Sequence, residues 1–171
     1  NPLPSPTREQ VERGVAAITA EDNRWRRCDL KTTSLLGNVL ARQLSADHGA
    51  AETVMFRDGW LTEASASNVW VVHEGALLGP PKSEHVLEGI RVELLNELCE
   101  EAGIAYNLRP IAEADVRTAD ELLLSSATKE VLPVTRLDGE PVGHGALRGK
   151  PGPVYAHLYE AYQRAKVAQS I

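Results

Sequence analysis

The chain has 171 residues, of which 43% are hydrophobic and 25% charged, a composition typical of one globular domain with its own core. Its 18 lysines and arginines against 24 aspartates and glutamates give a net charge of −6 and form no dense basic run, so we expect no nucleic-acid or membrane partner. Two distant cysteines, five histidines without metal-ligand spacing and no long apolar run predict no disulfide framework, no metal site, no membrane span and a reducing, cytoplasmic location.

The first quarter of the chain is expected to hold a linker and two helices. NPLPSP, with three prolines, predicts an interdomain linker at 1–6. Apolar residues then recur at helical spacing and predict a helix within 7–22. Residues 24–31 lack such a stripe and are expected to be extended. The next stripe predicts a helix over 36–44 that ends near Gly49.

From Glu52 onward the pattern alternates between strands and helices. Short β-rich runs fill 52–81, with hairpin turns expected at Arg57-Asp58-Gly59 and His73-Glu74-Gly75. A leucine stripe predicts a helix over 89–101. The order predicts an α/β fold, a mixed sheet interleaved with helices in one domain at 7–171. The remaining expected elements are strands in NLRPI and ELLLSS around a short acidic helix, a hairpin at Asp138-Gly139, a flexible loop and a final amphipathic helix from Pro153.

The stretch CDLKTTSLLGN places Lys31 where the extended segment meets an apolar-faced helix. A lysine amine forms a Schiff base with an aldehyde cofactor when it is unprotonated, a state that burial or neighbouring cations favour. A position just before a helix fixes the backbone and leaves the long side chain free to move. Lys31 is therefore a candidate covalent anchor for a cofactor, with an ordinary surface lysine as the alternative.

The stretch WLTEASASNVW places Glu63 in a strand-like run followed by four small residues. Small side chains leave room for a flat ring against the backbone. A carboxylate that faces a pyridine nitrogen keeps that nitrogen protonated, the state in which the ring best accepts electrons. Glu63 is a candidate for this role, and a solvent-facing strand glutamate is the alternative.

Two further stretches suit a phosphate group. In VLEGIRVELL, Gly89 precedes a helix, so the backbone N–H groups of Ile90 and Arg91 could bind an anion while Leu87 covers a ring. In LLLSSATKEVLPV, a buried strand opens into small and hydroxyl residues that offer further contacts to phosphate or carboxylate. A plain helix start and a routine loop are the alternatives. The residues of the second stretch are Ser126, Ala127 and Thr128.

Together these stretches resemble the C-terminal domain of class IV (fold-type IV) pyridoxal-phosphate aminotransferases, over essentially the whole chain. RWRRCDLK followed by LLGN is most similar to D-amino-acid aminotransferases. Branched-chain aminotransferases and aminodeoxychorismate lyases share the lysine and the serine-rich stretch but usually differ just before the lysine. The stretches that carry the resemblance are RGVAAITAEDNRWRRCDLKTTSLLGNVLA, LTEASASNVW, LEGIR, ADELLLSSATKEVLPV, LDGEPVG and GKPGPV.

The resemblance implies pyridoxal 5′-phosphate as cofactor and a role for each candidate residue. Lys31 matches the lysine that holds the cofactor and moves a proton between it and the substrate α-carbon. Glu63 matches the carboxylate that faces the pyridine nitrogen, and Arg24 matches an arginine near the phenolic oxygen. The residues matched to ring packing and phosphate binding are Leu87, Gly89, Ile90, Arg91, Ser126, Ala127 and Thr128.

The chain also departs from the family pattern. Arg91 and Ala127 stand where the family often has threonine, so phosphate binding is expected to rely on backbone N–H groups and on the Arg91 guanidinium. The loop GHGALRGKPGP is a few residues longer than usual. The family's smaller N-terminal domain, which supplies a phosphate-binding arginine and much of the substrate site, has no counterpart here, so we expect the chain to be part of a longer protein.

The resemblance therefore implies transamination between a D-alanine-like D-amino acid and a 2-oxo acid. It also implies that the protein is a homodimer and that its ligands are these small molecules. Aminodeoxychorismate lyase or branched-chain aminotransferase activity at the same lysine is an alternative within the family. A catalytically silent domain that only binds or dimerises is an alternative from a different class.

Overall fold

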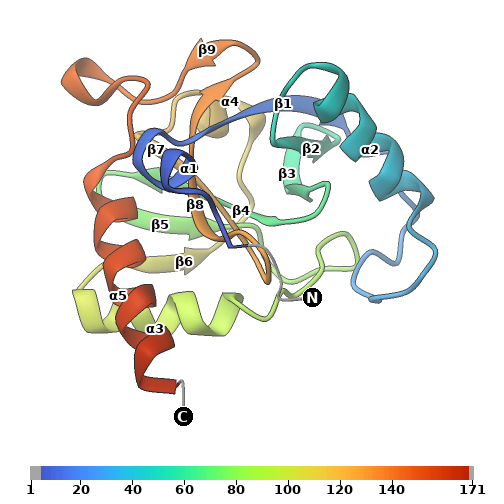
Figure 1. The fold of residues 1–171 in the computed structure, drawn as a ribbon. Coiled ribbons are helices and arrows are strands. Elements are labelled where there is room, and N and C mark those ends of the chain that lie inside the picture. The colour runs from blue at the N-terminus through green and yellow to red at the C-terminus, as the bar shows by residue number, and fades with distance from the viewer. Residues whose placement is uncertain (1–4, 170–171) are drawn as a thin grey trace.

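The computed structural model describes residues 5–169, so positions 1–4 of the expected linker lie outside the described residues. Helices and strands alternate along the chain, as expected for the α/β class (Figure 1). The helices are α1 (Arg8–Arg13), α2 (Leu36–Asp47), α3 (Val92–Ala102), α4 (Glu113–Arg117) and α5 (Pro153–Gln169), with a 3₁₀ turn at Gly145–Leu147. The strands are β1 (Val15–Glu21), β2 (Glu52–Arg57), β3 (Trp60–Ala64), β4 (Asn68–His73), β5 (Ala76–Gly79), β6 (Tyr106–Leu108), β7 (Glu121–Ser126), β8 (Glu130–Leu137) and β9 (Glu140–Pro141).

Within residues 5–169 the strands form one nine-stranded mixed sheet, which confirms the predicted fold class. Its order is β3-β2-β1-β8-β7-β4-β5-β6, with β9 paired to β8. β1 runs parallel to both β2 and β8, and β5 runs parallel to β6, whereas the other pairs are antiparallel. The sheet curls, because β3 leads directly into β4 and the Ala64 N–H donates to the Ser67 carbonyl at 2.8 Å.

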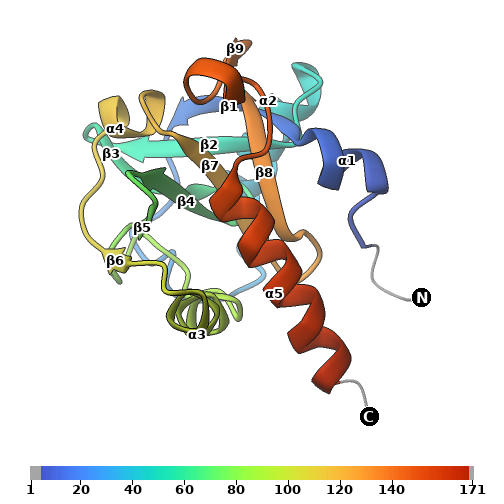
Figure 2. The same cartoon turned by 90° about the vertical axis from the view of Figure 1, so that its left-hand side faces the viewer.

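The curled sheet separates two hydrophobic cores. Side chains alternate between the faces of a strand, so Val69 and Val71 of β4 enter one core while Trp70 and Val72 enter the other. The first core lies inside the curl and includes residues of β1, β2, β3, β7 and β8. The second lies between the sheet and the helices α3 and α5, which pack together on one side of it (Figure 2).

The three hairpin turns predicted from sequence are confirmed. Each has an acidic residue followed by glycine in the left-handed region: Asp58 and Gly59 at φ 52° and 80°, Glu74 and Gly75 at 50° and 78°, and Asp138 and Gly139 at 51° and 84°. This pair of positive φ values matches the right-handed twist of the flanking strands. The turns join β2 to β3, β4 to β5, and β8 to β9.

The helix predicted within 7–22 is wrong beyond Arg13. Gly14 has φ 76°, and a side chain there would overlap Thr135, so the helix ends at this point. The following residues form β1, which is sandwiched between β2 and β8. The apolar spacing fits a helix, but VAAITAE contains β-branched residues that favour a strand, and two neighbouring strands are available to pair with it.

Two other segments differ from expectation, and one predicted helix forms with an exposed apolar face. Residues 24–31 form bends and a turn, in which the Leu30 N–H donates to the Arg27 carbonyl at 3.2 Å, rather than an extended segment. α3 begins at Val92 instead of Gly89 and ends at the expected Gly103, which is left-handed. α2 forms as predicted and continues to Asp47, but its apolar face is exposed, with Leu36 at 71% and Leu40 at 59%.

Candidate functional site

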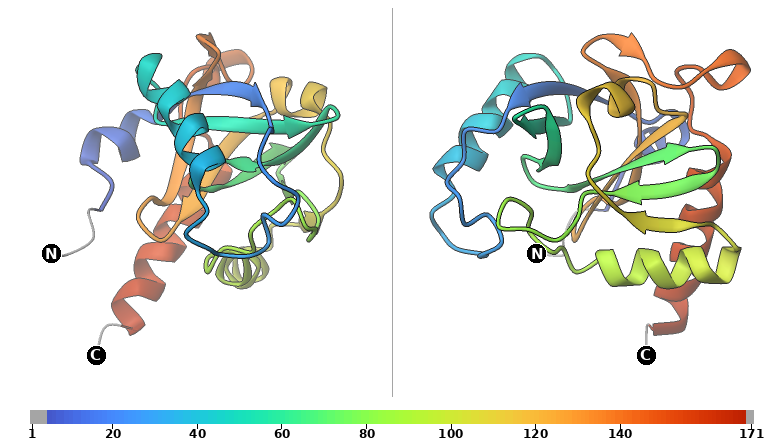
Figure 3. Two further views of the ribbon diagram at one scale, coloured as in Figure 1. Left: turned by 90° about the vertical axis from the view of Figure 1, so that its right-hand side faces the viewer. Right: turned by 180° about the vertical axis from the view of Figure 1, so that it is seen from behind.

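Lys31 lies in the irregular segment between β1 and α2. Its side chain is exposed, and within residues 5–169 its amine has no hydrogen-bond or ion-pair partner. The segment itself is held at both ends. The Cys28 N–H donates to the Glu84 carbonyl at 2.7 Å, and the Asn38 amide donates to the Ser65 carbonyl at 3.0 Å. Figure 3 shows this segment beside the loop that precedes α3, in agreement with the hydrogen bond from Cys28 to Glu84.

Glu63 is buried on β3 and its two carboxylate oxygens have different partners. Arg24 donates to Oε1, and the Leu87 N–H donates to Oε2 at 3.0 Å. The side chains of Arg24 and Glu63 are 3% and 7% exposed, so the pair is shielded from water. Each oxygen accepts one bond here and can accept a second, which leaves room for a ring N–H. Arg24, Glu63 and Leu87, three of the predicted site residues, therefore lie together, although Arg24 was matched to the phenolic oxygen rather than to Glu63.

A second carboxylate holds Arg24 in place. Asp22 accepts from Arg24 Nε and Nη2, both at 2.9 Å, and from the Thr62 hydroxyl at 2.9 Å. Arg57 approaches Asp22 at 3.2 Å and donates to the Arg24 carbonyl at 2.9 Å. Two acidic and two basic side chains thus balance in charge. Sequence reasoning missed Asp22 and Arg57, although an acidic residue directly after a buried apolar strand was a usable signal.

The electrostatics of this cluster follow from burial and pairing. Burial raises the pKa of the Glu63 carboxyl, and the Arg24 charge and the Leu87 N–H oppose it. Burial also acts to raise the pKa of Asp22, but the hydrogen bonds and charge of Arg24 lower it overall. Burial acts to lower the pKa of Arg24, yet the two carboxylates raise it above its usual value. Arg24 is therefore a permanent cation beside Glu63.

The loop before α3 brings its predicted residues to the same region. Leu87 is half-buried, and its carbonyl accepts from the Asn68 amide at 2.8 Å. A side chain on Gly89 would overlap Asn68 Oδ1, so the amide that binds the Leu87 carbonyl would have to move. The N–H groups of Ile90 and Arg91 donate to no other described residue. Arg91 stacks on Tyr162 at 5.1 Å, and its buried Nε has no partner among the described residues.

The predicted second phosphate segment is the turn between β7 and β8. Ser126 accepts the Lys129 N–H at 3.1 Å, and Ala127 and Thr128 are exposed at the tip. No hydrogen bond or ion pair joins this turn to Arg91 in the described part of the chain. Both instead lie beside α5, where Arg91 covers Tyr162 and Glu130 binds Gln163 at 2.9 Å.

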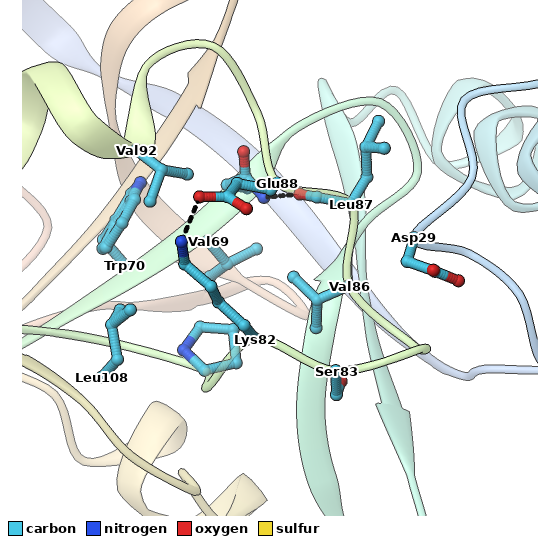
Figure 4. A pocket seen from close by; sticks show the side chains of 12 residues that line it. Asp29, Val69, Trp70, Lys82, Ser83, Val86, Leu87, Glu88, Val92 and Leu108 are labelled. Carbon is cyan, nitrogen blue, oxygen red and sulfur yellow. Dashed lines mark hydrogen bonds and ion pairs between the residues drawn. The ribbon is translucent and has the colours of Figure 1, made fainter.

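A cavity of about 280 Å³ lies next to this region, between β4 and the loop before α3. Figure 4 shows Lys82 and Glu88, which form an ion pair, beside Trp70, while Leu87 is at the far side. The cavity shares Leu87 and Asn68 with the candidate site, but neither Lys31 nor Glu63 lines it. Leu87 connects the two, because its N–H donates to Glu63 and the same residue lines the cavity.

A sequence profile described as "Amino-transferase class IV" matches residues 1–137, most of the chain. The chain belongs to the class IV aminotransferase family. D-alanine aminotransferase from Bacillus licheniformis is 37% identical over 169 residues, 99% of this chain and 58% of that protein. The enzyme of the same name from Staphylococcus haemolyticus is 36% identical over 156 residues, 91% and 54% of the two chains.

Solved structures of class IV enzymes share the fold. The Escherichia coli branched-chain amino acid aminotransferase has a TM-score of 0.85 at 26% identity, covering 96% of this chain and 55% of that chain. The branched-chain amino acid aminotransferase from Thermobaculum terrenum, in its PLP form, has a TM-score of 0.85 at 22% identity, covering 98% and 55%. The chain thus spans a little over half the length of these class IV relatives.

No helix within 5–169 is long and apolar enough to cross a membrane. The same residues contain no group of three or more His, Cys, Asp or Glu side chains that could hold a metal ion.

Proposed function

We propose that the protein is a pyridoxal-phosphate-dependent aminotransferase that exchanges an amino group between a D-amino acid and a 2-oxo acid. Family membership and 37% identity to a D-alanine aminotransferase support this proposal. The observation that carries it is the buried Glu63–Arg24 pair beside Leu87, a carboxylate kept next to a permanent cation with a free lone pair on each oxygen.

In this proposal Lys31 forms the covalent link to the cofactor, and its Nζ carries the proton to and from the substrate α-carbon. When bound, pyridoxal phosphate supplies an electron sink for the pair of electrons left on that carbon. Glu63 keeps a proton on the ring nitrogen, and Arg24 orients the Glu63 carboxylate. Arg24 contacts Glu63 and Asp22 here, so we propose that it acts on the nitrogen side of the ring.

In this proposal two groups of hydrogen-bond donors bind the phosphate of the cofactor. The N–H groups of Ile90 and Arg91 are unpaired ahead of α3, where the helix dipole favours an anion. The turn Ser126–Thr128 offers a second set of N–H groups and two hydroxyls. The unpartnered Nε of Arg91 is a further donor that an anion would satisfy.

Incubation with D-alanine and 2-oxoglutarate tests the function. We expect pyruvate and D-glutamate in equal amounts, with cofactor added and products separated on a chiral column. The solved branched-chain relative from Escherichia coli motivates L-leucine as the matched alternative substrate. Turnover of L-leucine but not D-alanine would replace the D-amino-acid proposal. Formation of 4-aminobenzoate from aminodeoxychorismate would indicate the lyase, and no turnover of any of these would favour the binding-module alternative.

We further propose that the protein forms a homodimer through the apolar face of α2. Leu36, Val39 and Leu40 are 71%, 58% and 59% exposed, which is unusual for three large apolar residues on one helix face. The double change Leu36→Glu and Leu40→Glu is expected to halve the mass measured by analytical ultracentrifugation, because two buried charges per subunit would oppose the contact. Val167→Glu, at an exposed position on α5, is the control and is expected to leave the mass unchanged. A monomeric unmodified protein would contradict the proposal.

A further inference from the structure

The carboxylate of Glu52 lies at the start of β2 with no exposed surface. It accepts hydrogen bonds from three side chains. The Ser67 hydroxyl reaches Oε1 at 2.8 Å, the Ser65 hydroxyl reaches Oε2, and the Lys129 ammonium reaches Oε1 at 2.8 Å. A buried carboxylate is retained only when its charge is paired and hydrogen-bonded, and here every one of these requirements is met by residues distant in sequence.

These three donors come from two turns with the same design. Ser65 and Ser67 flank Ala66, which is exposed at the tip of the turn from β3 to β4. Lys129 follows Ala127 and Thr128, which are exposed at the tip of the turn from β7 to β8. Each tip is free to meet a ligand while its base is tied to Glu52. One carboxylate therefore sets the position of both tips relative to each other.

The turn from β7 to β8 depends on Lys129 in particular. Its side chain is 19% exposed and its ammonium reaches Glu52, 77 residues away in sequence, whereas its N–H closes the turn on Ser126 at 3.1 Å. On the other side, Glu130 has φ 55° and is held by Gln163 at 2.9 Å and Lys166 at 2.5 Å. Anchors on both sides leave the N–H groups of Ala127 and Thr128 in one arrangement.

We propose that Lys129 and Glu52 are positioning residues that hold the turn 126–128 in the arrangement that binds the cofactor phosphate. This inference rests on the proposed function. Neither residue touches the cofactor in it. Lys129 also adds a positive charge behind a turn in which Ala127 provides no hydroxyl, so the turn binds an anion through oriented N–H groups and a nearby cation.

The test compares two ligands that differ only in the phosphate. Dissociation constants for pyridoxal 5′-phosphate and for pyridoxal are measured by quenching of tryptophan fluorescence, for the unmodified protein and for Lys129→Met. We expect the constant for pyridoxal 5′-phosphate to rise roughly tenfold, because the N–H groups of the turn lose their fixed orientation, while that for pyridoxal changes less than about twofold. A general loss of folded protein weakens both ligands equally, so the ratio of the two constants isolates the phosphate.

Two matched variants sharpen the comparison. Lys129→Arg keeps the charge next to Glu52 and is expected to keep most of the preference for the phosphate. Lys150→Met removes an exposed lysine whose ammonium donates to the Ala146 carbonyl at 3.1 Å, and is expected to leave both constants unchanged. An unchanged ratio in Lys129→Met, or equal weakening of both ligands, would overturn the positioning role. If the unmodified protein binds neither ligand, the proposed function itself fails, which is a different result.

Discussion

Lys31→Ala is expected to abolish transamination without destabilising the protein. The amine is the only group assigned both the covalent link and the proton transfer, and proton transfer alone is worth about 10²- to 10⁴-fold in rate. We therefore expect the rate of pyruvate formation from D-alanine to fall at least about a thousandfold. Because the Lys31 side chain is exposed and has no partner in the described residues, the free energy of unfolding should change by less than about 0.5 kcal/mol.

Two further variants distinguish loss of the Lys31 primary amine from loss of a positive charge. Lys31→Arg keeps a cation at this position but removes the primary amine, and it should be as inactive as the alanine variant. Lys150→Ala removes another exposed lysine and should retain full activity. Activity of Lys31→Ala within tenfold of the unmodified protein would show that a different residue carries the reaction.

Arg24→Met is expected to be the most destabilising single change at the site. Arg24 is 3% exposed and forms ion pairs with Asp22 and Glu63, whose side chains are 0% and 7% exposed. Its loss leaves two buried carboxylates with only Arg57 nearby, at 3.2 Å from Asp22. Breaking a buried pair in this way typically costs about 3–5 kcal/mol, so urea unfolding should show a loss of that order.

The loss should also depend on pH in a defined direction. In the unmodified protein the pKa of Asp22 is lowered, so its stabilising effect exists above the unfolded pKa and disappears as the pH falls through the folded value. Without Arg24 the main interactions that lower the two carboxyl pKa values are lost, so both values rise and the variant becomes less stable as the pH rises. The loss of unfolding free energy caused by Arg24→Met should therefore be larger at about pH 7.5 than at about pH 5.

Arg27→Met provides the matched control for this experiment. Arg27 lies in the same segment and pairs with Asp29 at 2.9 Å, but their side chains are 54% and 34% exposed. Solvent screens such a pair, so its removal should leave the unfolding curve nearly unchanged. Equal effects of Arg24→Met and Arg27→Met would show that burial does not set the strength of the Arg24 cluster.

Features that depend on local chemistry were predictable from sequence. The three hairpin turns require positive φ at two successive residues, and Asp-Gly or Glu-Gly supplies them within the turn itself. The candidate Glu63 was recognisable because it interrupts a β-rich run among small residues. The left-handed end of α3 at Gly103 followed from the glycine alone.

Features that depend on distant partners were not predictable in the same way. The segment after Gly14 fits a helical spacing, and only its pairing with β2 and β8 makes it a strand. Asp22 and Arg57 contact each other because β1 and β2 are neighbours in the sheet. Glu52 binds side chains from two turns that are far apart in the sequence. An acidic residue at the start of the apolar run ETVMF was the signal that sequence reasoning passed over.

The placement of β1 between β2 and β8 has a consequence for how the chain reaches its native state. Val15 of β1 pairs with Val134 of β8, so this pairing joins segments from opposite ends of the described chain. Contacts this far apart in sequence slow the search for the native topology. Refolding of this domain should accordingly be slower than that of a helical domain of the same length.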